Sequence, residues 1–332
     1  MMEMTDKACS VSHIGVFTSG GDAPGMNAAI RAVVRTAHFH GVAVSGIYGG
    51  FDGLIKDEIK NMEVRDVSNI IQRGCTILRS ARSAAFRTLE GRSLAKATLD
   101  RHGIDGLVAI GGDGTFRGAA QFSKEFGVPV VGITGTIDND LAGTDTTIGF
   151  DTATNTAMEA VDKIRDTASS HDRMFFVEVM GRTCGAIALH CGIAAGAEYI
   201  MVPEREQGID DLITALEHAA TSKSSVIVIV AEGDEEGGAY EIAKKVKERY
   251  NHYDTRVSVL GHVQRGGNPS VADRVLASRS GVAAVEALIS GHTEIMVGER
   301  HGKTALIPFA EVLDNRPVLE EDLLRILHIL SI

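Results

Sequence analysis

The sequence predicts an α/β fold made of two doubly wound, Rossmann-like lobes. Short apolar runs rich in β-branched residues alternate with stretches of amphipathic helical periodicity along all 332 residues. Strand, helix and strand at this spacing require parallel strands joined by right-handed crossovers. The strands also outnumber those that one such sheet carries in this length, so we expect two lobes with a cleft between them.

The elements follow one another in a regular order. A strand at 13–18 leads through a glycine-rich turn into a helix on which Ile30, Val33, Val34 and Ala37 share one face. Further strands are expected at 42–48, 107–110, 128–133, 174–179, 199–202, 226–231 and 256–260. Further helices are expected at 114–126, 152–166, 212–220, 242–250 and 271–289. Ligands of such sheets bind at the loops that follow the strands.

Composition narrows the class of protein. Glycine accounts for 37 of the 332 residues, about 11%, whereas its average usage in proteins is about 7%. Because the chain has only 6 prolines, the extra glycines are expected at special backbone positions. A net charge of -11 repels nucleic acid, which is excluded as a partner. No long apolar stretch indicates a membrane span, and the N-terminal residues lack the apolar core of a signal peptide. A cytoplasmic protein is therefore expected.

The first strand-to-helix loop contains Gly20, Gly21 and Gly25. Glycine N–H groups at a helix amino terminus can approach an anion closely. A tight turn with a helix cap would explain one or two of these glycines but hardly three, which favours phosphate binding.

The second loop, Gly111-Gly112-Asp113-Gly114-Thr115, has the same position relative to its strand and helix. Arg117 stands where the dinucleotide-binding motif needs its third glycine, so the loop is not that motif. Asp113 among glycines suits a Mg²⁺ ion that bridges phosphates, because Mg²⁺ prefers one or two carboxylates with phosphate oxygens and water. A plain helix cap by Asp113 is the alternative.

The third loop carries two carboxylates. Asp138 and Asp140 flank one asparagine, so in an extended segment they point to the same side. One could then act as a base while the other orients it or helps to hold a metal. Asn-Asp pairs are also common in turns, which leaves both interpretations open for this loop alone. Three such loops in one sheet favour a functional site.

Two further patterns imitate known sites. Residues 298–304 resemble a Walker A loop, but Val297 stands at the required first glycine, so we expect an ordinary loop. His38 and His40 lack the additional ligands of a metal site and are expected at the surface.

The combined loops resemble the bacterial-type ATP-dependent 6-phosphofructokinases. The resemblance extends to Ser80-Ala81-Arg82, to Val179-Met180-Gly181-Arg182 and to Leu260-Gly261-His262-Val263-Gln264-Arg265-Gly266-Gly267, in the same order and at similar spacings. It covers the chain from about Ile14 to about Gly291. It implies a glycolytic kinase that transfers the γ-phosphate of ATP to the 1-hydroxyl of fructose 6-phosphate, giving fructose 1,6-bisphosphate and ADP.

The resemblance also assigns the nucleotide site and the catalytic groups. The ATP-binding residues implied are Gly21, Arg82, Ser83, Gly112, Asp113, Gly114 and Thr115, with Asp113 as the Mg²⁺ ligand. Asp138 is similar to the family's base, and Asp140 would support it. Thr136 and Arg182 are expected to contact the transferred phosphoryl group, and Arg82 completes the catalytic set.

For fructose 6-phosphate the resemblance implies Thr136, Ile137, Asp138, Arg173, Met180, Gly181, Arg182, Glu232, Arg256, His262 and Arg265. Guanidinium groups suit a phosphate because they form two parallel hydrogen bonds with it. In the family, the equivalents of Arg173 and Arg256 come from a neighbouring subunit, which implies a homotetramer with shared active sites. The larger, ATP-binding lobe is expected at 1–149 plus about 264–314, and the smaller, sugar-phosphate-binding lobe at about 150–263 plus 315–332.

Residues at a few individual positions indicate the phosphoryl donor and the strength of allosteric regulation. Relatives that use pyrophosphate carry Asp at the position of Gly114 and Lys at that of Gly135, so glycine at both favours ATP. A pyrophosphate-dependent kinase and a catalytically silent sugar-phosphate- or nucleotide-binding regulator are the alternatives. The family's effector site, which takes ADP or phosphoenolpyruvate between subunits, is matched by Arg31, Arg35, Arg165, Glu198 and Lys223. Val64 and Thr221 replace basic residues there, so altered or weakened allostery is expected.

Overall fold

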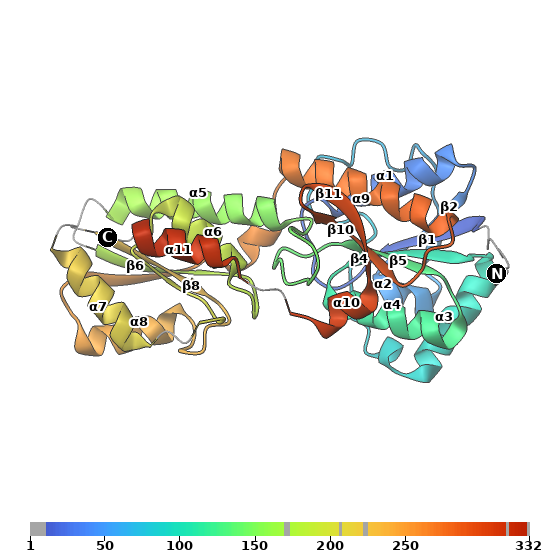
Figure 1. The fold of residues 1–332 in the computed structure, drawn as a ribbon. Helices are drawn as coiled ribbons and strands as arrows, with labels where there is room; N and C mark the ends of the chain where they lie inside the picture. The colour runs from blue at the N-terminus through green and yellow to red at the C-terminus, as the bar shows by residue number, and fades with distance from the viewer. Residues whose placement is uncertain (1–10, 169–172, 206–207, 222–224, 317–318, 331–332) are drawn as a thin grey trace, which may run out of the picture. The chain divides into compact units, whose positions relative to one another are not determined.

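The computed structural model describes residues 11–168, 173–205, 208–221, 225–316 and 319–330. The chain divides into two compact units, each with its own sheet (Figure 1). The first unit takes the residues up to 136 together with 141–149 and 267–316. The second takes 137–140, 150–266 and Pro317–Ile332. The short segment 137–140 thus belongs to the second unit although both of its neighbours belong to the first.

The described part of the first unit forms a seven-stranded sheet in the order β11-β10-β5-β4-β1-β2-β3. Its strands are β1 His13–Thr18, β2 Ala43–Ile47, β3 Ile59–Asn61, β4 Gly106–Gly111, β5 Val130–Thr134, β10 Ile295–Arg300 and β11 Lys303–Pro308. The five central strands are parallel, and the two edge strands, β3 and β11, pair antiparallel to their neighbours. The carboxyl ends of β1, β4 and β5 therefore meet at one edge of the sheet.

Helices cover both faces of this sheet (Figure 1). They are α1 Met26–Phe39, α2 Gly50–Lys56, the 3₁₀ turn η1 Ala85–Arg87, α3 Leu89–His102, α4 Asp113–Phe126, α9 Val271–Ile289 and α10 Phe309–Asp314. On one face α1 packs against α9, and on the other lie α3, α4 and α10. The doubly wound arrangement buries the apolar strands on both sides.

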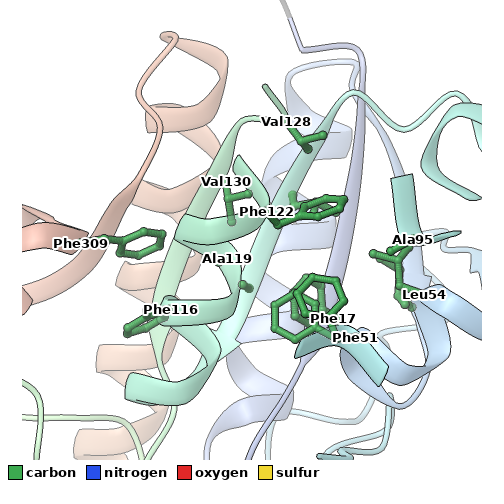
Figure 2. Close-up of a cluster of buried hydrophobic side chains, with 14 of the residues drawn as sticks. Phe17, Phe51, Leu54, Ala95, Phe116, Ala119, Phe122, Val128, Val130 and Phe309 are labelled. Carbon is green, nitrogen blue, oxygen red and sulfur yellow. The ribbon is translucent and has the colours of Figure 1, made fainter. Parts of the chain in front are cut away.

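The core between the sheet and α2, α3, α4 and α10 is rich in phenylalanine (Figure 2). Phe51 stacks on Phe86 with ring centroids 3.9 Å apart, and Phe86 lies 5.5 Å from Phe122. Phe116 stacks on Phe309 at 5.2 Å. This cluster fixes α4, which begins at the second glycine-rich loop, against the sheet.

The described part of the second unit has a four-stranded sheet in the order β7-β8-β6-β9, with every neighbouring pair parallel. Its strands are β6 Arg173–Val179, β7 Tyr199–Met201, β8 Val226–Ala231 and β9 Asp254–Val259. Its helices are α5 Phe150–Ala168, α6 Ala186–Ala195, α7 Ile209–Ala220, α8 Ala239–Arg249, the 3₁₀ turn η2 Gly261–Arg265 and α11 Glu321–Leu330. In Figure 1, α5, α6 and α11 lie on one face of this sheet, and α7 and α8 on the other.

The prediction of doubly wound α/β architecture is confirmed, and every strand predicted from the sequence is present. The prediction of an ordinary loop at 298–304 is wrong, because this stretch forms the turn and flanking strands of the β10–β11 hairpin. His301 and Gly302 make its tight turn with φ of 52° and 71°. His38 and His40 are exposed at the end of α1, as expected. In the described residues, no helix has the length and apolar character needed to cross a membrane.

The phenylalanine core yields a prediction for stability. Phe122 is fully buried, so Phe122→Ala should lower the free energy of unfolding by about 3–5 kcal/mol through lost burial and a cavity. Urea denaturation followed by circular dichroism measures this change. Phe39, 83% exposed, supplies the control, since Phe39→Ala should change the value by less than about 0.5 kcal/mol. Equal losses for the two variants would contradict the assignment of the core.

Candidate active site

Three loops meet at the carboxyl ends of β1, β4 and β5. The Ser19 N–H donates to the Ile110 carbonyl at 3.0 Å, and the Thr115 hydroxyl donates to the Ser19 carbonyl at 3.1 Å. The Gly135 N–H donates to the Gly111 carbonyl at 2.9 Å. The sequence-predicted loops at 19–25, 111–115 and 135–136 therefore contact one another.

Gly111 is the point of closest approach. A Cβ atom there would lie 2.3 Å from the Thr115 hydroxyl and 2.6 Å from the Ser19 carbonyl oxygen, so no side chain fits. Gly25 has a different reason to be glycine, since it precedes α1 with φ of 107°, a conformation that side chains disfavour.

The backbone of these loops is open to a ligand. Gly21 and Gly114 are exposed, and a Cβ atom on Gly114 would meet nothing within 4 Å. Both α1 and α4 begin here, so two helix amino termini direct N–H groups and positive partial charge to this edge of the sheet. The first unit thus carries an arrangement suited to an anion such as a chain of phosphates.

Asp113 is the first residue of α4, and 43% of its side chain is exposed. Its carboxylate lies 3.9 Å from the Arg117 Nε. Within the described ranges, no group of three or more His, Cys, Asp or Glu side chains could hold a metal by itself. A cation at Asp113 would therefore take its other ligands from water or from a bound substrate, which fits Mg²⁺ carried by phosphates.

Arg82 and Ser83 follow a segment that touches the first loop. The Ser80 hydroxyl donates to the Gly20 carbonyl at 2.6 Å, so Arg82 emerges two residues from the glycine-rich turn. Arg82 is exposed. The Ser83 hydroxyl lies 3.3 Å from an Asp52 carboxylate oxygen and accepts the Phe86 N–H at 3.2 Å.

In the second unit, Asp138 is almost completely buried, with 3% of its surface exposed. Burial raises the pKa of its carboxyl from 3.8 to about 6, and the neighbouring Asp140 charge acts in the same direction. Arg265 and Arg182 lower this pKa, and Glu232 raises it. The structure therefore brings four other sequence-predicted residues close enough to influence the Asp138 carboxyl, which is ionised near neutral pH yet basic.

Arg182 is held by the loop that follows β6. The Arg182 guanidinium lies 3.5 Å from the Asp140 carboxylate. The backbone N–H of Arg182 donates to the Glu232 carboxylate at 2.8 Å. The residue has φ of 56°, a strained conformation for a side chain, as is common at functional sites. A Cβ atom on Gly233 would lie 1.9 Å from the Arg182 carbonyl oxygen, so this glycine lets the loops after β6 and β8 meet.

Gln264 is a site residue to which the sequence assigned no role. It is fully buried, and its side-chain oxygen accepts the Met180 N–H at 2.9 Å. This bond connects the loop after β6 to η2, which carries His262 and Arg265. Its position next to Arg265 in the glycine-rich motif could have indicated a role at the site, but the spacing of the motif residues does not predict that Gln264 is buried.

Thr136 and Ile137 join the two sets of loops along the chain. Both are buried, and the Thr136 carbonyl accepts the Thr147 hydroxyl at 2.7 Å. Thr136 also lies near Gly112, because a Cβ atom on that glycine would be 3.6 Å from the Thr136 Cβ.

Arg173 and Arg256 lie elsewhere in the second unit. Arg173 is the first residue of β6, whereas Met180, Gly181 and Arg182 follow its last residue. Six residue steps of about 3.3 Å put Arg173 roughly 20 Å from that end of the strand. Arg256 lies in β9 opposite Phe175, also toward the amino end of β6. The structure does not bring these two arginines to Asp138 of the same chain.

The expected effector residues are distributed over both units. Arg31 and Arg35 lie on α1. Arg165 donates to two carbonyl groups at the end of α6, at 2.7 and 3.1 Å. Glu198 is buried and accepts an N–H group of β8 at 2.7 Å. Lys223 lies outside the described residues.

Comparison with known proteins identifies the relatives of this architecture. Residues 13–288 match the family described as Phosphofructokinase. The chain is 56% identical to ATP-dependent 6-phosphofructokinase 1 of Thermus thermophilus, over 97% of this chain and 100% of the relative. It is 52% identical to ATP-dependent 6-phosphofructokinase 2 of Bacteroides thetaiotaomicron, over 97% of this chain and 99% of the relative.

A solved phosphofructokinase structure from Saccharomyces cerevisiae superimposes with a TM-score of 0.86 at 39% identity. The match covers 91% of this chain and 45% of the yeast chain, so the chain spans less than half of that protein. The resemblance to this family that the sequence motifs indicated is confirmed.

The charges around Asp138 yield a prediction. Arg265→Gln removes the largest influence that lowers the pKa of this carboxyl, so that pKa should rise above about 6. Carboxyl ¹³C NMR titration of protein labelled at aspartate measures it. Arg325→Gln, an exposed change on α11, is the control and should leave the titration where it is. An unchanged or lower pKa in Arg265→Gln would contradict the electrostatic assignment.

Proposed function

The chain belongs to the phosphofructokinase family, and from this premise we propose that it is an ATP-dependent 6-phosphofructokinase. It transfers the γ-phosphate of ATP to the 1-hydroxyl of fructose 6-phosphate, giving fructose 1,6-bisphosphate and ADP. The observation that carries this proposal is Asp138, a buried carboxyl whose pKa of about 6 suits a base, surrounded by arginine side chains. A role in glycolysis and a cytoplasmic location form part of the proposal.

The first unit binds the nucleotide. The N–H groups of the loops containing Gly21, Gly112 and Gly114 receive the phosphates, and Thr115 supports the second loop from within. Asp113 would hold the Mg²⁺ that accompanies ATP, and the ion would supply positive charge that neutralises the phosphate oxygens. Arg82 supplies a guanidinium beside the Gly20 turn.

The second unit performs the proton transfer. Asp138 takes the proton from the 1-hydroxyl as that oxygen attacks the γ-phosphorus, and the bond from the γ-phosphorus to the bridging oxygen of ADP breaks. Asp140, paired with Arg182, supports the base and orients the guanidinium. Arg182 and Arg82 stabilise negative charge on the transferred group, and Thr136 contributes a neutral donor.

The sugar phosphate is bound by Met180, Gly181, Glu232, His262 and Arg265 of one chain. The 6-phosphate also requires Arg173 and Arg256, which lie toward the other end of the strands that carry the site. A second copy of the chain can supply them. This separation supports the proposed homotetramer with active sites shared between subunits.

The glycines at 114 and 135 support ATP as the donor. Space around Gly114 is open, so an aspartate there would project a negative charge where the nucleotide phosphates bind. A Cβ atom on Gly135 would lie 3.0 Å from the Met26 side chain and 3.2 Å from the Gly111 nitrogen. A lysine at that position would therefore require a shift in the first and second loops.

Regulation by ADP or phosphoenolpyruvate at Arg31, Arg35, Arg165, Glu198 and Lys223 is proposed in altered or weakened form. The bonds of Arg165 and Glu198 to backbone groups give both a structural role in the second unit. The alternative of a silent regulator is disfavoured because a binding protein needs no buried base such as Asp138.

Asp138→Asn tests the base. The turnover number should fall by about 10²–10⁴-fold, because the amide cannot accept the proton, while the Michaelis constants stay near wild type.

In wild-type protein, the turnover number should rise with pH through a midpoint of about 6, because Asp138 is a base only when ionised. A coupled assay for ADP measures both. Asp105→Asn, a change in the first unit, is the control.

Undiminished turnover in Asp138→Asn would remove this residue from its assigned role. A wild-type protein that binds both substrates without turnover would favour the silent regulator.

Gly114→Asp tests donor selection. It should lower kcat/KM for ATP by about tenfold or more, equivalent to about 1.4 kcal/mol, and leave the KM for fructose 6-phosphate nearly unchanged. The matched control is Gly114→Ala, which adds a methyl group in open space without charge and should retain the wild-type constants. Assays with ATP or pyrophosphate as the sole donor measure the effect. Wild-type turnover with pyrophosphate but not with ATP would overturn the donor assignment.

A further inference from the structure

Residues 73–83, which we term the arginine segment, contain no helix or strand, yet they end at Arg82 and Ser83. Cys75 and Arg79 within it each have φ of 56°, in the left-handed region. Such a conformation is unfavourable for a residue other than glycine, and it persists only where the surroundings impose it. The contacts that impose it are therefore of interest.

Asn27 makes the first of these contacts. This side chain lies in the first turn of α1 and is 1% exposed. Its amide nitrogen donates to the Arg73 carbonyl at 3.1 Å and to the Gly74 carbonyl at 3.0 Å. Its amide oxygen accepts the Ile77 N–H at 2.7 Å. One side chain thus holds the backbone on both sides of the strained residue at 75.

Asparagine suits this position for a chemical reason. The segment presents two acceptors and one donor, and only a carboxamide offers two N–H groups and one oxygen in so small a side chain. Aspartate would place a second oxygen against two carbonyl groups, and alanine would leave three backbone groups without this partner.

Thr18, at the end of β1, holds the other strained residue. Its hydroxyl donates to the Arg79 carbonyl at 2.7 Å and lies 2.9 Å from the Thr76 hydroxyl, which accepts the Leu78 N–H at 3.2 Å. With the Thr18 proton directed at Arg79, the Thr76 hydroxyl donates to Thr18, and the three bonds form one continuous chain.

Arg82 depends on this support, because it is exposed and forms no ion pair with any residue that the structure describes. Its position follows from the backbone that precedes it, which Asn27 and Thr18 hold and which the Ser80 hydroxyl connects to Gly20. The helix that carries Asn27 is also the one whose amino terminus faces the glycine-rich turn.

We propose that Asn27, assisted by Thr18, is a positioning residue that holds the arginine segment so that Arg82 meets the transferred phosphoryl group. The inference rests on the proposed kinase function for the role of Arg82. Asn27 touches no substrate and acts only through the arginine segment. It fixes the distance between the guanidinium of Arg82 and the phosphates bound at the start of α1.

A double-mutant cycle on the full chain tests the proposal. Asn27→Ala should lower kcat by about 10- to 100-fold, since a displacement of about 1 Å at a catalytic group has an effect of that size. In the background of Arg82→Ala, the same change should lower kcat less than twofold, because the group that it positions is already gone. Independent, multiplicative losses in the two single variants would overturn the proposal.

Two further variants separate positioning from general damage. Thr18→Val keeps the side-chain shape, removes the hydroxyl that holds Arg79, and should show the same coupling to Arg82→Ala, so it serves if Asn27→Ala fails to fold. Asp105→Ala is the matched control, because Asp105 also holds backbone groups of the first unit, the N–H groups of Ser12 and His13. It should lower thermal stability and leave kcat unchanged.

Hydrogen exchange measured by mass spectrometry gives a readout that needs no activity. Asn27→Ala should accelerate exchange in peptides covering 73–83, which include the Ile77 amide, with the strands of the sheet unaffected. Unchanged exchange in that segment would overturn the proposal. Wild-type protein without turnover would instead refute the kinase function, and the exchange result would still decide whether Asn27 holds the segment.

Discussion

The edge of the first unit at the carboxyl ends of β1, β4 and β5 depends on the close approach of backbone to backbone at Gly111. The loop after β1 reaches this glycine from one side and the loop after β5 from the other, and the Gly111 carbonyl itself accepts a hydrogen bond. Even a methyl group there would overlap Ser19 and Thr115. With the loops pushed apart, the N–H groups at the start of α1 and α4 could not face the same anion. Part of the glycine surplus is therefore explained by space.

A second constraint is the balance of charge at Asp138. Burial and Asp140 raise its pKa, while Arg265 and Arg182 lower it, and the outcome is about 6. A carboxyl that the arginines dominated would be a weak base with a low pKa, and one that was only buried would be protonated at neutral pH. The net charge of -11 has little influence here, because local arginines set the potential at the site.

The sequence predicted those features that leave a periodic or compositional trace. The bounds expected for β1, β8 and α9 are those observed. The helix α6 left no such trace, because it is apolar on almost every side and mostly buried, which removes the 3.6-residue pattern. The hairpin of β10 and β11 was not predicted, because residues 298–304 resemble a Walker A loop and the turn at His301 and Gly302 has no Asn-Gly or Asp-Gly signature.

The sequence predicted the charged residues of the candidate site but not the buried side chains that hold them in place. Motifs identified Arg82 and Arg182, whose side chains carry charge. The groups that hold them, such as Asn27 and Gln264, use side-chain bonds to irregular backbone, and no spacing rule connects residue 27 to residues 73–77. Arg173 and Arg256 illustrate a similar limit. A sequence motif can predict that a residue belongs to a site, but it cannot show which copy of the chain supplies that residue. Both lie near one carboxylate, Asp254, at 3.6 and 2.7 Å. That carboxylate keeps two cations together in a single chain, and β9, which contains it, is an edge strand of the described sheet. In the proposed tetramer, a sugar phosphate presented by a second copy would compete with Asp254 for these two guanidinium groups.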